Sequence, residues 1–259
     1  MRVLVIPDVH QTDIGLNIAK KYIDSVDKVV FLGDYVDSFD SNALRGTEND
    51  GPHTLEKIFS FKKNNMDKVV LLCGNHDFSY IAVTRDGQNV SGHQSDYAKI
   101  SEVIRGNKEL LEAAVKIDDI VYSHAGISKQ WYIQNGKPSI EKMNTWLHEV
   151  REEHFNWDGL FDGAGDEPMQ TPFWIRPASL CIGSKYVGDK RFYNMHYSKQ
   201  VVGHTELCEN NEPFILNNKV KNFEIMPDDA ELIILDSQER TCIKIFEDGK
   251  LSNWKADMN

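Results

Sequence analysis

The chain has 259 residues, of which 41% are hydrophobic, so it is long enough to bury a sizeable core. It carries 40 acidic and 29 basic residues, which gives a formal net charge of −11 at pH 7. This balance argues against a general nucleic-acid or anionic-membrane surface, since both require clustered positive charge. A small phosphorylated substrate is not excluded, because bound cations can reverse the local sign of a pocket.

Helical and strand-like stretches alternate along the chain without a Pro/Gly/Ser-rich linker, so we expect one α/β domain over residues 1–259. Helices are predicted over 13–26, over 54–63 with Thr54 as N-cap, and from about Tyr97 to Ala114. A polar turn is expected to join the last two predicted strands, and an Asp248-Gly249 turn follows them. The apolar, often β-branched runs predict strands over 2–6, 28–32, 68–72, 119–123, 200–203, 231–236 and 241–246.

Residues 125–199 combine several aromatic residues with an acidic stretch from Glu149 to Glu167. The region is compatible with an elaboration over one end of the sheet, at the active-site end, and equally with helices that pack against the sheet.

The four cysteines, at 73, 181, 208 and 242, are scattered and form no C-x-x-C pair. This usage fits a reducing compartment better than a disulfide framework. The N-terminal sequence MRVLVIPDVH has too short an apolar run for a signal peptide, and no stretch approaches 18 apolar residues. We therefore expect a cytoplasmic protein with no membrane partner.

Polar side chains follow five of the predicted strands at the point where each strand ends. In α/β folds the carboxyl ends of strands converge on one crevice, so these side chains are expected to lie close together. They are Asp8 and His10; Asp34 and Asp37; Asn75, His76 and Asp77; His124; and His204.

Carboxylate, imidazole and carboxamide groups without a thiolate suit divalent Mn, Fe or Zn. A set of this size could hold two ions, and a carboxylate between them would let them approach to roughly 3.5–4 Å. Each cluster alone is also compatible with a turn, a helix cap or a buried histidine. Their occurrence at successive strand ends favours a metal site.

The same residues carry a resemblance to a known family. The sequence has PDVHQ at 7–11, GDYVDS at 33–38, GNHD at 74–77, SHAG at 123–126 and VGHT at 202–205. In order and spacing these blocks resemble those of the calcineurin-like metallophosphoesterases, in the branch of the serine/threonine phosphoprotein phosphatases and the symmetrical diadenosine tetraphosphatases. The resemblance implies an α/β sandwich of two mixed β-sheets flanked by helices.

The resemblance also implies a role for each residue. Asp8, His10 and Asp34 would bind a first metal ion, and Asp34 would bridge to a second ion. The second ion would be completed by Asn75, His124 and His204, with Asn75 also a candidate to contact the substrate. His76 would be the general acid, and Asp37 would hold its ring. Two divalent ions are expected, with manganese preferred over iron or zinc.

Three positions depart from the family pattern. Pro7 and Gln11 stand where glycines are usual, and Ser38 replaces an arginine that binds phosphate in the phosphoprotein phosphatases. A hydroxyl does not reproduce bidentate binding by a guanidinium group. Arg176, within Trp174-Ile175-Arg176, is the best remaining candidate for a phosphate ligand; Arg191 and Arg45 are weaker candidates.

The predicted reaction is hydrolysis of a phosphate ester or anhydride by a metal-activated hydroxide. The expected substrate is a phosphorylated small molecule, either a phosphomonoester or a nucleotide-like phosphate, or else a phosphopeptide. A serine/threonine protein phosphatase and a diadenosine polyphosphate hydrolase are the alternatives, the latter because HAGISKQW at 124–131 is similar to sequence in that group. A nuclease is less favoured because the chain is acidic. A non-catalytic metal-binding scaffold is less favoured because the chain keeps both His76 and Asp37, which no metal ion requires.

Overall fold

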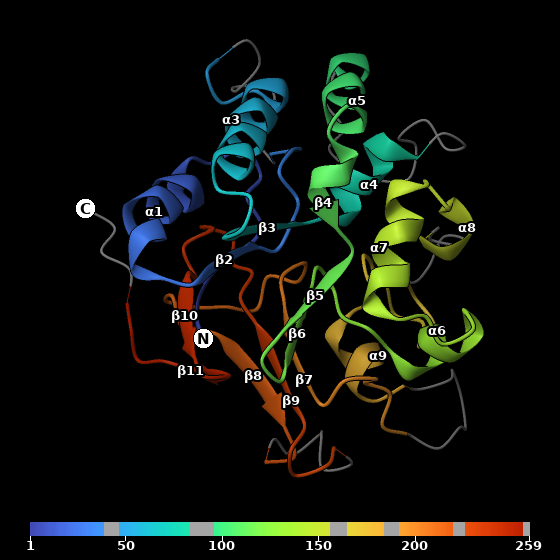
Figure 1. Ribbon diagram of the computed structural model, residues 1–259. Helices are drawn as coiled ribbons and strands as arrows, with labels where there is room; N and C mark the ends of the chain where they lie inside the picture. Colours follow the sequence, from blue (N-terminus) through green and yellow to red (C-terminus); the bar gives the residue numbers. More distant parts are fainter. Residues whose placement is uncertain (39–46, 83–95, 156–164, 184–191, 220–225, 256–259) are drawn as a thin grey trace.

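The computed structural model describes residues 1–38, 47–82, 96–155, 165–183, 192–219 and 226–255. Two mixed β-sheets pack face to face, and helices cover their outer faces (Figure 1). This is the α/β sandwich that the sequence predicts. Within the described residues, no helix is long and apolar enough to cross a membrane.

The first sheet contains six strands in the order β11-β10-β1-β2-β3-β4. The four strands from β1 to β4 are parallel, and β10 and β11 are antiparallel additions at one edge. The strands are β1 (Arg2–Ile6), β2 (Lys28–Phe31), β3 (Val69–Leu72), β4 (Leu111–Glu112), β10 (Lys244–Glu247) and β11 (Lys250–Leu251).

The second sheet contains five strands in the order β5-β6-β7-β9-β8. The central strands β6, β7 and β9 are parallel, and both edge strands are antiparallel to their neighbours. The strands are β5 (Ala114–Ile117), β6 (Ile120–Ser123), β7 (Lys199–Val202), β8 (Phe214–Asn217) and β9 (Glu231–Ile234).

The parallel strands are apolar on both faces because each face is covered. In β1, Val3 and Val5 lie in the core between the two sheets, whereas Leu4 and Ile6 lie in the core beneath the helices. This alternation is the period of two that places successive side chains on opposite faces of a strand. It explains why the sequence of β1 is a continuous β-branched run rather than an alternation of polar and apolar residues.

Helices α1, α3, α4 and α5 lie along the outer face of the first sheet, and α6, α7 and α8 lie beside them (Figure 1). Helix α9 packs on the second sheet, where Leu180 shares a core cluster with Val202 and Leu232. Short 3₁₀ turns follow α1 at Ile23–Ser25 and precede β4 at Lys108–Leu110. The helices are α1 (Ile14–Tyr22), α3 (Gly51–Asn64), α4 (Asn75–Ile81), α5 (Tyr97–Arg105), α6 (Lys129–Gln134), α7 (Ile140–His148), α8 (Glu152–Phe155) and α9 (Pro177–Cys181).

Two of the helix predictions were wrong in their boundaries. Asp50, not Thr54, caps α3, because its Oδ1 accepts a hydrogen bond of 2.9 Å from the backbone N–H of His53. The helix predicted from Tyr97 to Ala114 ends at Arg105, and the residues that follow enter β4 and β5. Gly106 is the C-cap residue at this point, and the short strands beyond it are stabilised by pairing that local sequence does not reveal.

Every predicted strand is present, but the last two are not neighbours. The segments around 231–236 and 241–246 contribute β9 to the second sheet and β10 to the first. The expected turn at Asp248-Gly249 joins β10 to β11, and both residues have positive φ, 49° and 73°. Two such residues suit a tight hairpin between strands with a right-handed twist.

The region 125–199 contains the helices α6 to α9, and side chains of this region join the core. Trp131, Phe155 and Phe173 are buried, and the rings of Phe155 and Phe173 pack on Phe78 of α4. This contact matters for the site because α4 begins at Asn75.

Cys208 and Cys242 form a disulfide bond, whereas Cys73 and Cys181 are free and buried. The expectation that the chain lacks disulfides was therefore wrong. The two partners are separated by 34 residues and meet because β7 and β9 lie side by side, which cysteine spacing alone does not indicate.

We predict that reducing this disulfide lowers the free energy of unfolding by about 2–4 kcal/mol, because the unfolded chain regains the freedom of a long loop. Urea unfolding with and without dithiothreitol measures the effect. The double variant Cys208→Ser/Cys242→Ser is the control and should not respond to the reductant. Labelling of all four thiols by iodoacetamide in denaturant without reductant would contradict the pairing.

Candidate metal centre

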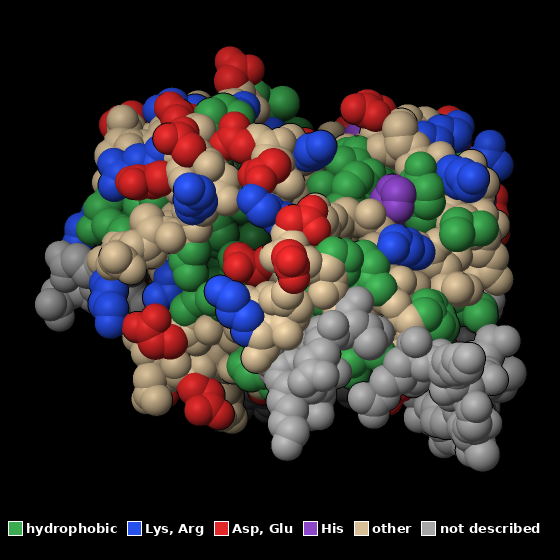
Figure 2. All heavy atoms as spheres, turned by 90° about the horizontal axis from the view of Figure 1, so that it is seen from below, with side chains coloured by type: hydrophobic (Ala, Val, Ile, Leu, Met, Phe, Trp, Pro, Cys, Tyr) green, Lys and Arg blue, Asp and Glu red, His purple; other side chains and the backbone are tan. Residues whose placement is uncertain are grey.

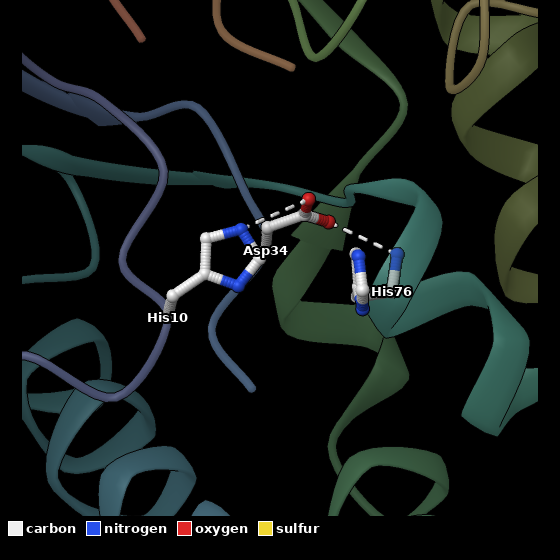
Figure 3. Close-up of side chains that lie close together, drawn as sticks. All are labelled: His10, Asp34 and His76. Carbon is white, nitrogen blue, oxygen red and sulfur yellow. Dashed lines mark hydrogen bonds and ion pairs between the residues drawn. The ribbon is translucent and has the colours of Figure 1, made fainter. Parts of the chain in front are cut away.

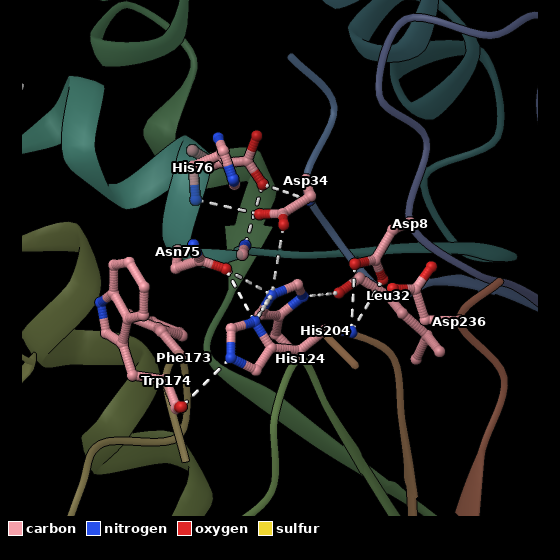
Figure 4. A network of polar contacts seen from close by, with 12 residues as sticks. Asp8, Leu32, Asp34, Asn75, His76, His124, Phe173, Trp174, His204 and Asp236 are labelled. Carbon is pink, nitrogen blue, oxygen red and sulfur yellow. Dashed lines mark hydrogen bonds and ion pairs between the residues drawn. The ribbon is translucent and has the colours of Figure 1, made fainter. Parts of the chain in front are cut away.

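Five loops meet at one end of the sandwich, where the parallel strands of both sheets finish. The loops follow β1, β2 and β3 of the first sheet and β6 and β7 of the second. The side chains that the sequence analysis singled out lie together here: Asp8, His10, Asp34, Asp37, Asn75, His76, His124 and His204. Figure 4 shows Asp8, Asp34, Asn75, His76, His124 and His204 among them.

Two groups of potential metal ligands share the carboxylate of Asp34. In the first group, donor atoms of His10, Asp34 and His76 lie within 4.8 Å of one another, and His10 Nε2 is 3.6 Å from Asp34 Oδ2 (Figure 3). The second group contains Asp34, His124 and His204, with His124 Nε2 3.5 Å from the same oxygen. A carboxylate shared in this way would let two ions approach to roughly 3.5–4 Å.

Asn75 adds a fourth donor to the second group. Its Oδ1 lies 2.8 Å from His124 Nε2 and 3.0 Å from His204 Nδ1, and these two nitrogen atoms are 3.2 Å apart (Figure 4). Three donor atoms from three different loops therefore converge on one point.

The protons of these histidines lie on the nitrogen atoms that face away from the point of convergence. His124 Nδ1 donates to the carbonyl of Leu32 over 2.8 Å, and His204 Nε2 donates to the carbonyl of Trp174 over 3.1 Å. The inward nitrogen atoms then carry lone pairs, and these lone pairs face the side-chain carbonyl oxygen of Asn75. A bound cation relieves this repulsion, so the donor set fits a divalent metal ion.

His10 follows the same rule in the first group. Its Nδ1 lies 3.0 Å from the carbonyl oxygens of both Val36 and Asp37, which fixes the proton on that nitrogen and leaves Nε2 facing Asp34. Burial lowers the pKa of His10 to about 3 and also lowers the pKa values of His124 and His204. Neutral imidazoles are the form that binds a metal ion.

Asp8 is buried between the two sheets and lies outside both groups of three. Both of its carboxylate oxygens accept from the backbone N–H of His204, at 3.2 and 3.0 Å. Burial raises its pKa well above the ordinary value, and the nearby carboxylates of Asp236 and Asp34 raise it further. A neighbouring cation would favour the ionised form. Its role as a metal ligand stays a prediction.

Four of the site residues hold a backbone conformation that is uncommon outside glycine. The φ angles of His10, Asp34, Asp37 and His204 are 40°, 52°, 58° and 63°. Such conformations cost free energy and persist where surrounding contacts impose them, often at functional sites.

Glycines beside the ligands leave room for them. A Cβ atom at Gly74 would lie 2.1 Å from Asp34 Oδ1, and one at Gly203 would lie 2.0 Å from Asp8 Oδ1. Any side chain at either position would therefore displace a carboxylate of the site.

Asp77 fixes the loop that carries Asp34. Its Oδ2 accepts from the backbone N–H groups of Asp34 and Gly74, at 2.7 and 2.8 Å, and its Oδ1 accepts from that of Tyr35 at 2.9 Å. One buried carboxylate in the first turn of α4 thus joins the ends of β2 and β3.

His76 and Asp37 form a pair beside the first group. His76 Nδ1 lies 2.9 Å from Asp37 Oδ2, and the hydroxyl of Tyr80 donates to Asp37 Oδ1 over 2.5 Å. His76 and Tyr80 are four residues apart on α4, so both reach the same carboxylate from one helix face. Burial lowers the pKa of His76, but the carboxylates of Asp34 and Asp37 outweigh it, and the net shift is upward.

Two of the departures from the family pattern contact each other. The Gln11 side chain accepts from the backbone N–H of Ser38 over 2.9 Å and donates to the carbonyl of Asn49 over 2.8 Å. Gln11 therefore ties the loop after β1 to the loop after β2. Arg45 and Arg191 lie outside the described residues.

Arg176 lies at the edge of the second group. Its Nη1 donates to the carbonyl of His204 over 3.1 Å and to Thr205 Oγ1 over 3.2 Å. The guanidinium group therefore supports the loop that carries His204.

The sequence analysis gave no role to Asp77, Tyr80, Asp236 or Arg240, all of which are buried around the site. Asp77 was part of the GNHD block, and the position of Tyr80 one helical turn after His76 was the available sign of its contact. Nothing in the local sequence marked Asp236 or Arg240, because the segment around Glu206 and Cys208, which they contact besides each other, is distant in the chain.

Known proteins resemble the chain in sequence and in fold. A family model described as calcineurin-like phosphoesterase matches residues 1–225. No curated protein gives a significant match.

Among solved structures, the cold-active protein-tyrosine phosphatase of a psychrophilic Shewanella species is 17% identical. Its TM-score is 0.57, with 96% of this chain and 76% of that chain covered. Another structure of a cold-active protein-tyrosine phosphatase is 18% identical, with a TM-score of 0.53 and coverage of 97% and 78%. At these identities the likeness shows a shared fold.

We predict that Gly74→Ala abolishes binding of at least one metal ion, because the new methyl group would occupy the position of Asp34 Oδ1. Mass spectrometry of metal content after loading with Mn²⁺ and desalting measures the result. Gly106→Ala, at the end of α5 and away from the site, is the control and should retain wild-type metal content. Two tightly held ions in Gly74→Ala would contradict the assigned position of Asp34.

Proposed function

The chain belongs to the calcineurin-like phosphoesterase family, and from this premise we propose that it hydrolyses phosphate monoesters or nucleotide-like phosphates at a two-metal centre. Family membership makes it a metal-dependent phosphoric ester hydrolase with two candidate His/Asp groups. The observation that carries the proposal is the carboxylate of Asp34, which belongs to both groups. The His76–Asp37 pair beside them supports a hydrolytic role.

Two divalent cations, when bound, supply Lewis-acid stabilisation of phosphoryl charge and activation of water as the nucleophile. Asp8, His10 and Asp34 are proposed to hold one ion. Asp34 is proposed to hold the second ion together with Asn75, His124 and His204. Oxygen and imidazole nitrogen donors without a thiolate suit manganese, iron or zinc. Manganese is the proposed metal, with iron or zinc as the alternatives.

His76 is the proposed general acid. Its Nδ1 is engaged by Asp37, so a proton on Nε2 is the one that it can deliver to a leaving oxygen. The carboxylates of Asp34 and Asp37 shift the pKa of His76 upward, and Asp37 stabilises the protonated ring. Tyr80 holds Asp37 in turn, so the ring orientation is fixed through two hydrogen bonds from one helix.

Arg176 is the proposed phosphate ligand. It would replace the arginine that the phosphoprotein phosphatases have at the position of Ser38. The guanidinium group is half-buried, and the carboxylates of Asp166, Asp236 and Asp34 attract its positive charge. Its contacts with His204 and Thr205 place positive charge at the edge of the second group. Asn75, at the N-terminus of α4, is proposed to contact the substrate as well as the ion.

A phosphopeptide and a diadenosine polyphosphate are the alternative substrates. The structural neighbours carry the name protein-tyrosine phosphatase, which favours including a phosphopeptide in any test. An extended nucleic acid is disfavoured by the net charge of −11. On the face shown in Figure 2, the acidic and basic side chains of the described residues are interspersed and form no continuous basic band.

The proposal is tested with purified protein loaded with Mn²⁺. Turnover of p-nitrophenyl phosphate is expected. If none of the three ions Mn²⁺, Fe²⁺ and Zn²⁺ supports turnover, the result would contradict a phosphatase of this class. A panel of an alkyl phosphate, phosphoserine and phosphotyrosine peptides, diadenosine tetraphosphate, a cyclic nucleotide and single-stranded DNA then separates the substrate classes. We expect the monoesters and nucleotide-like phosphates to have the highest kcat/KM.

We predict that His76→Ala lowers kcat by about 10²-fold or more for an alkyl phosphate and by much less for p-nitrophenyl phosphate. An alkoxide leaving group needs a proton, whereas p-nitrophenolate is stable without one. The variant should still bind two Mn²⁺ ions. His53→Ala, which removes a histidine of α3 outside the site, is the control.

Equal losses for the two substrates, or a loss of one metal ion, would remove His76 from the role of acid. The second outcome would instead make it a metal ligand, a role that its place in the first group also allows.

A further inference from the structure

A buried ionic cluster lies behind the second metal group, on the segment between β9 and β10. Arg240 forms ion pairs with Asp236 and with Glu206, the latter at 2.9 Å, and its Nη1 also donates to the carbonyl of Ser237 over 2.9 Å. The side chains of Arg240 and Asp236 are only 4% and 2% exposed. None of these residues belongs to the groups that could hold a metal ion.

The cluster is joined to the loop that carries His204. Glu206 lies two residues after His204, and the backbone N–H groups of Leu207 and Cys208 donate to the carbonyl of Asp236, at 3.2 and 2.9 Å. The Cys208–Cys242 disulfide closes the same contact covalently. The loop after β7 is therefore clamped to residues 236–242.

The clamp also reaches Asp8, a proposed ligand of the first ion. The backbone N–H of His204 binds both carboxylate oxygens of Asp8, so the position of this loop also sets the position of Asp8. Figure 4 shows Asp236 beside Asp8, and the two carboxylates interact electrostatically. Arg240 supplies a buried positive charge that interacts with the carboxylates of both Asp8 and Asp236. Without this charge the repulsion between the two buried carboxylates would not be compensated.

We propose that Arg240 is a positioning residue of the metal centre: it clamps the His204 loop and compensates the charge of Asp236 beside Asp8. The inference rests on the proposed two-metal function and deepens it. Arg240 touches neither substrate nor reacting atoms in this account. It acts through His204 and Asp8, so its removal weakens metal binding and leaves substrate binding at saturating metal unchanged.

The fork of the guanidinium group matters as well as its charge. One nitrogen of Arg240 serves Asp236 and the other serves Glu206, whereas a lysine ammonium cannot span both carboxylates in the same way. Arg240→Lys should therefore recover part of the metal affinity that Arg240→Met loses.

The test is a calorimetric Mn²⁺ titration of the full chain, combined with p-nitrophenyl phosphate kinetics over a range of Mn²⁺ concentrations. For Arg240→Met we expect at least tenfold weaker binding of one or both ions. The Mn²⁺ concentration for half-maximal activity should rise in parallel, while KM at saturating Mn²⁺ stays within twofold of the wild-type value. The Mn²⁺ affinity of Arg240→Lys should lie between those of Arg240→Met and the wild-type chain.

Lys62→Met is the matched control for simple loss of a buried cation. Lys62 binds the carbonyls of Met66 and Val69, at the opposite end of β3 from Asn75. The control should lower the melting temperature without changing Mn²⁺ affinity. If Arg240→Met behaves in the same way, Arg240 has a structural role alone and the proposal is overturned.

Glu206→Gln decides the question if Arg240→Met does not fold. Glu206 is partly exposed, so its substitution should leave the fold intact and still weaken the clamp, with Mn²⁺ binding reduced severalfold. Wild-type Mn²⁺ affinity in folded Glu206→Gln would then overturn the proposal. Absence of Mn²⁺ binding by the wild-type chain would instead contradict the two-metal function, so the two failures are distinguishable.

Discussion

The shared carboxylate of Asp34 is the constraint on which the rest of the site depends. It is the one member common to both potential ligand groups among the described residues. Its backbone is held by Asp77, its φ angle is positive, and its Oδ1 occupies space that only a glycine at position 74 leaves open. The ends of β2 and β3 are thus built around one side chain.

Much of the fold could be predicted because its strands are encoded locally. β1, β2 and β3 are runs of apolar, mostly β-branched residues, and burial on both faces explains each run. The short strand β4 was missed because it depends on pairing with β3, which is distant in the chain. The edge strands β5 and β8 were missed because each has only four residues and no continuous buried run. The separation of β9 and β10 into different sheets has the same origin, since a polar connection says nothing about which edge each strand joins.

The inner residues of the site could also be predicted, and their supports could not. Asp34, His124 and His204 directly follow recognisable strands, and the convergence of parallel strand ends brings them together. Tyr80, Asp236 and Arg240 act through contacts that only the folded chain creates. The disulfide between Cys208 and Cys242 belongs to the same class, because it joins two segments that meet only through the second sheet. Sequence patterns therefore indicated the candidate ligands, and tertiary structure revealed the contacts that hold them.

Low-temperature electron paramagnetic resonance of the chain loaded with two equivalents of Mn²⁺ tests the central claim most directly. A carboxylate shared between two ions couples their electron spins, so the account predicts the spectrum of an exchange-coupled manganese pair. Two independent six-line spectra, or a single bound ion, would contradict a centre organised around Asp34.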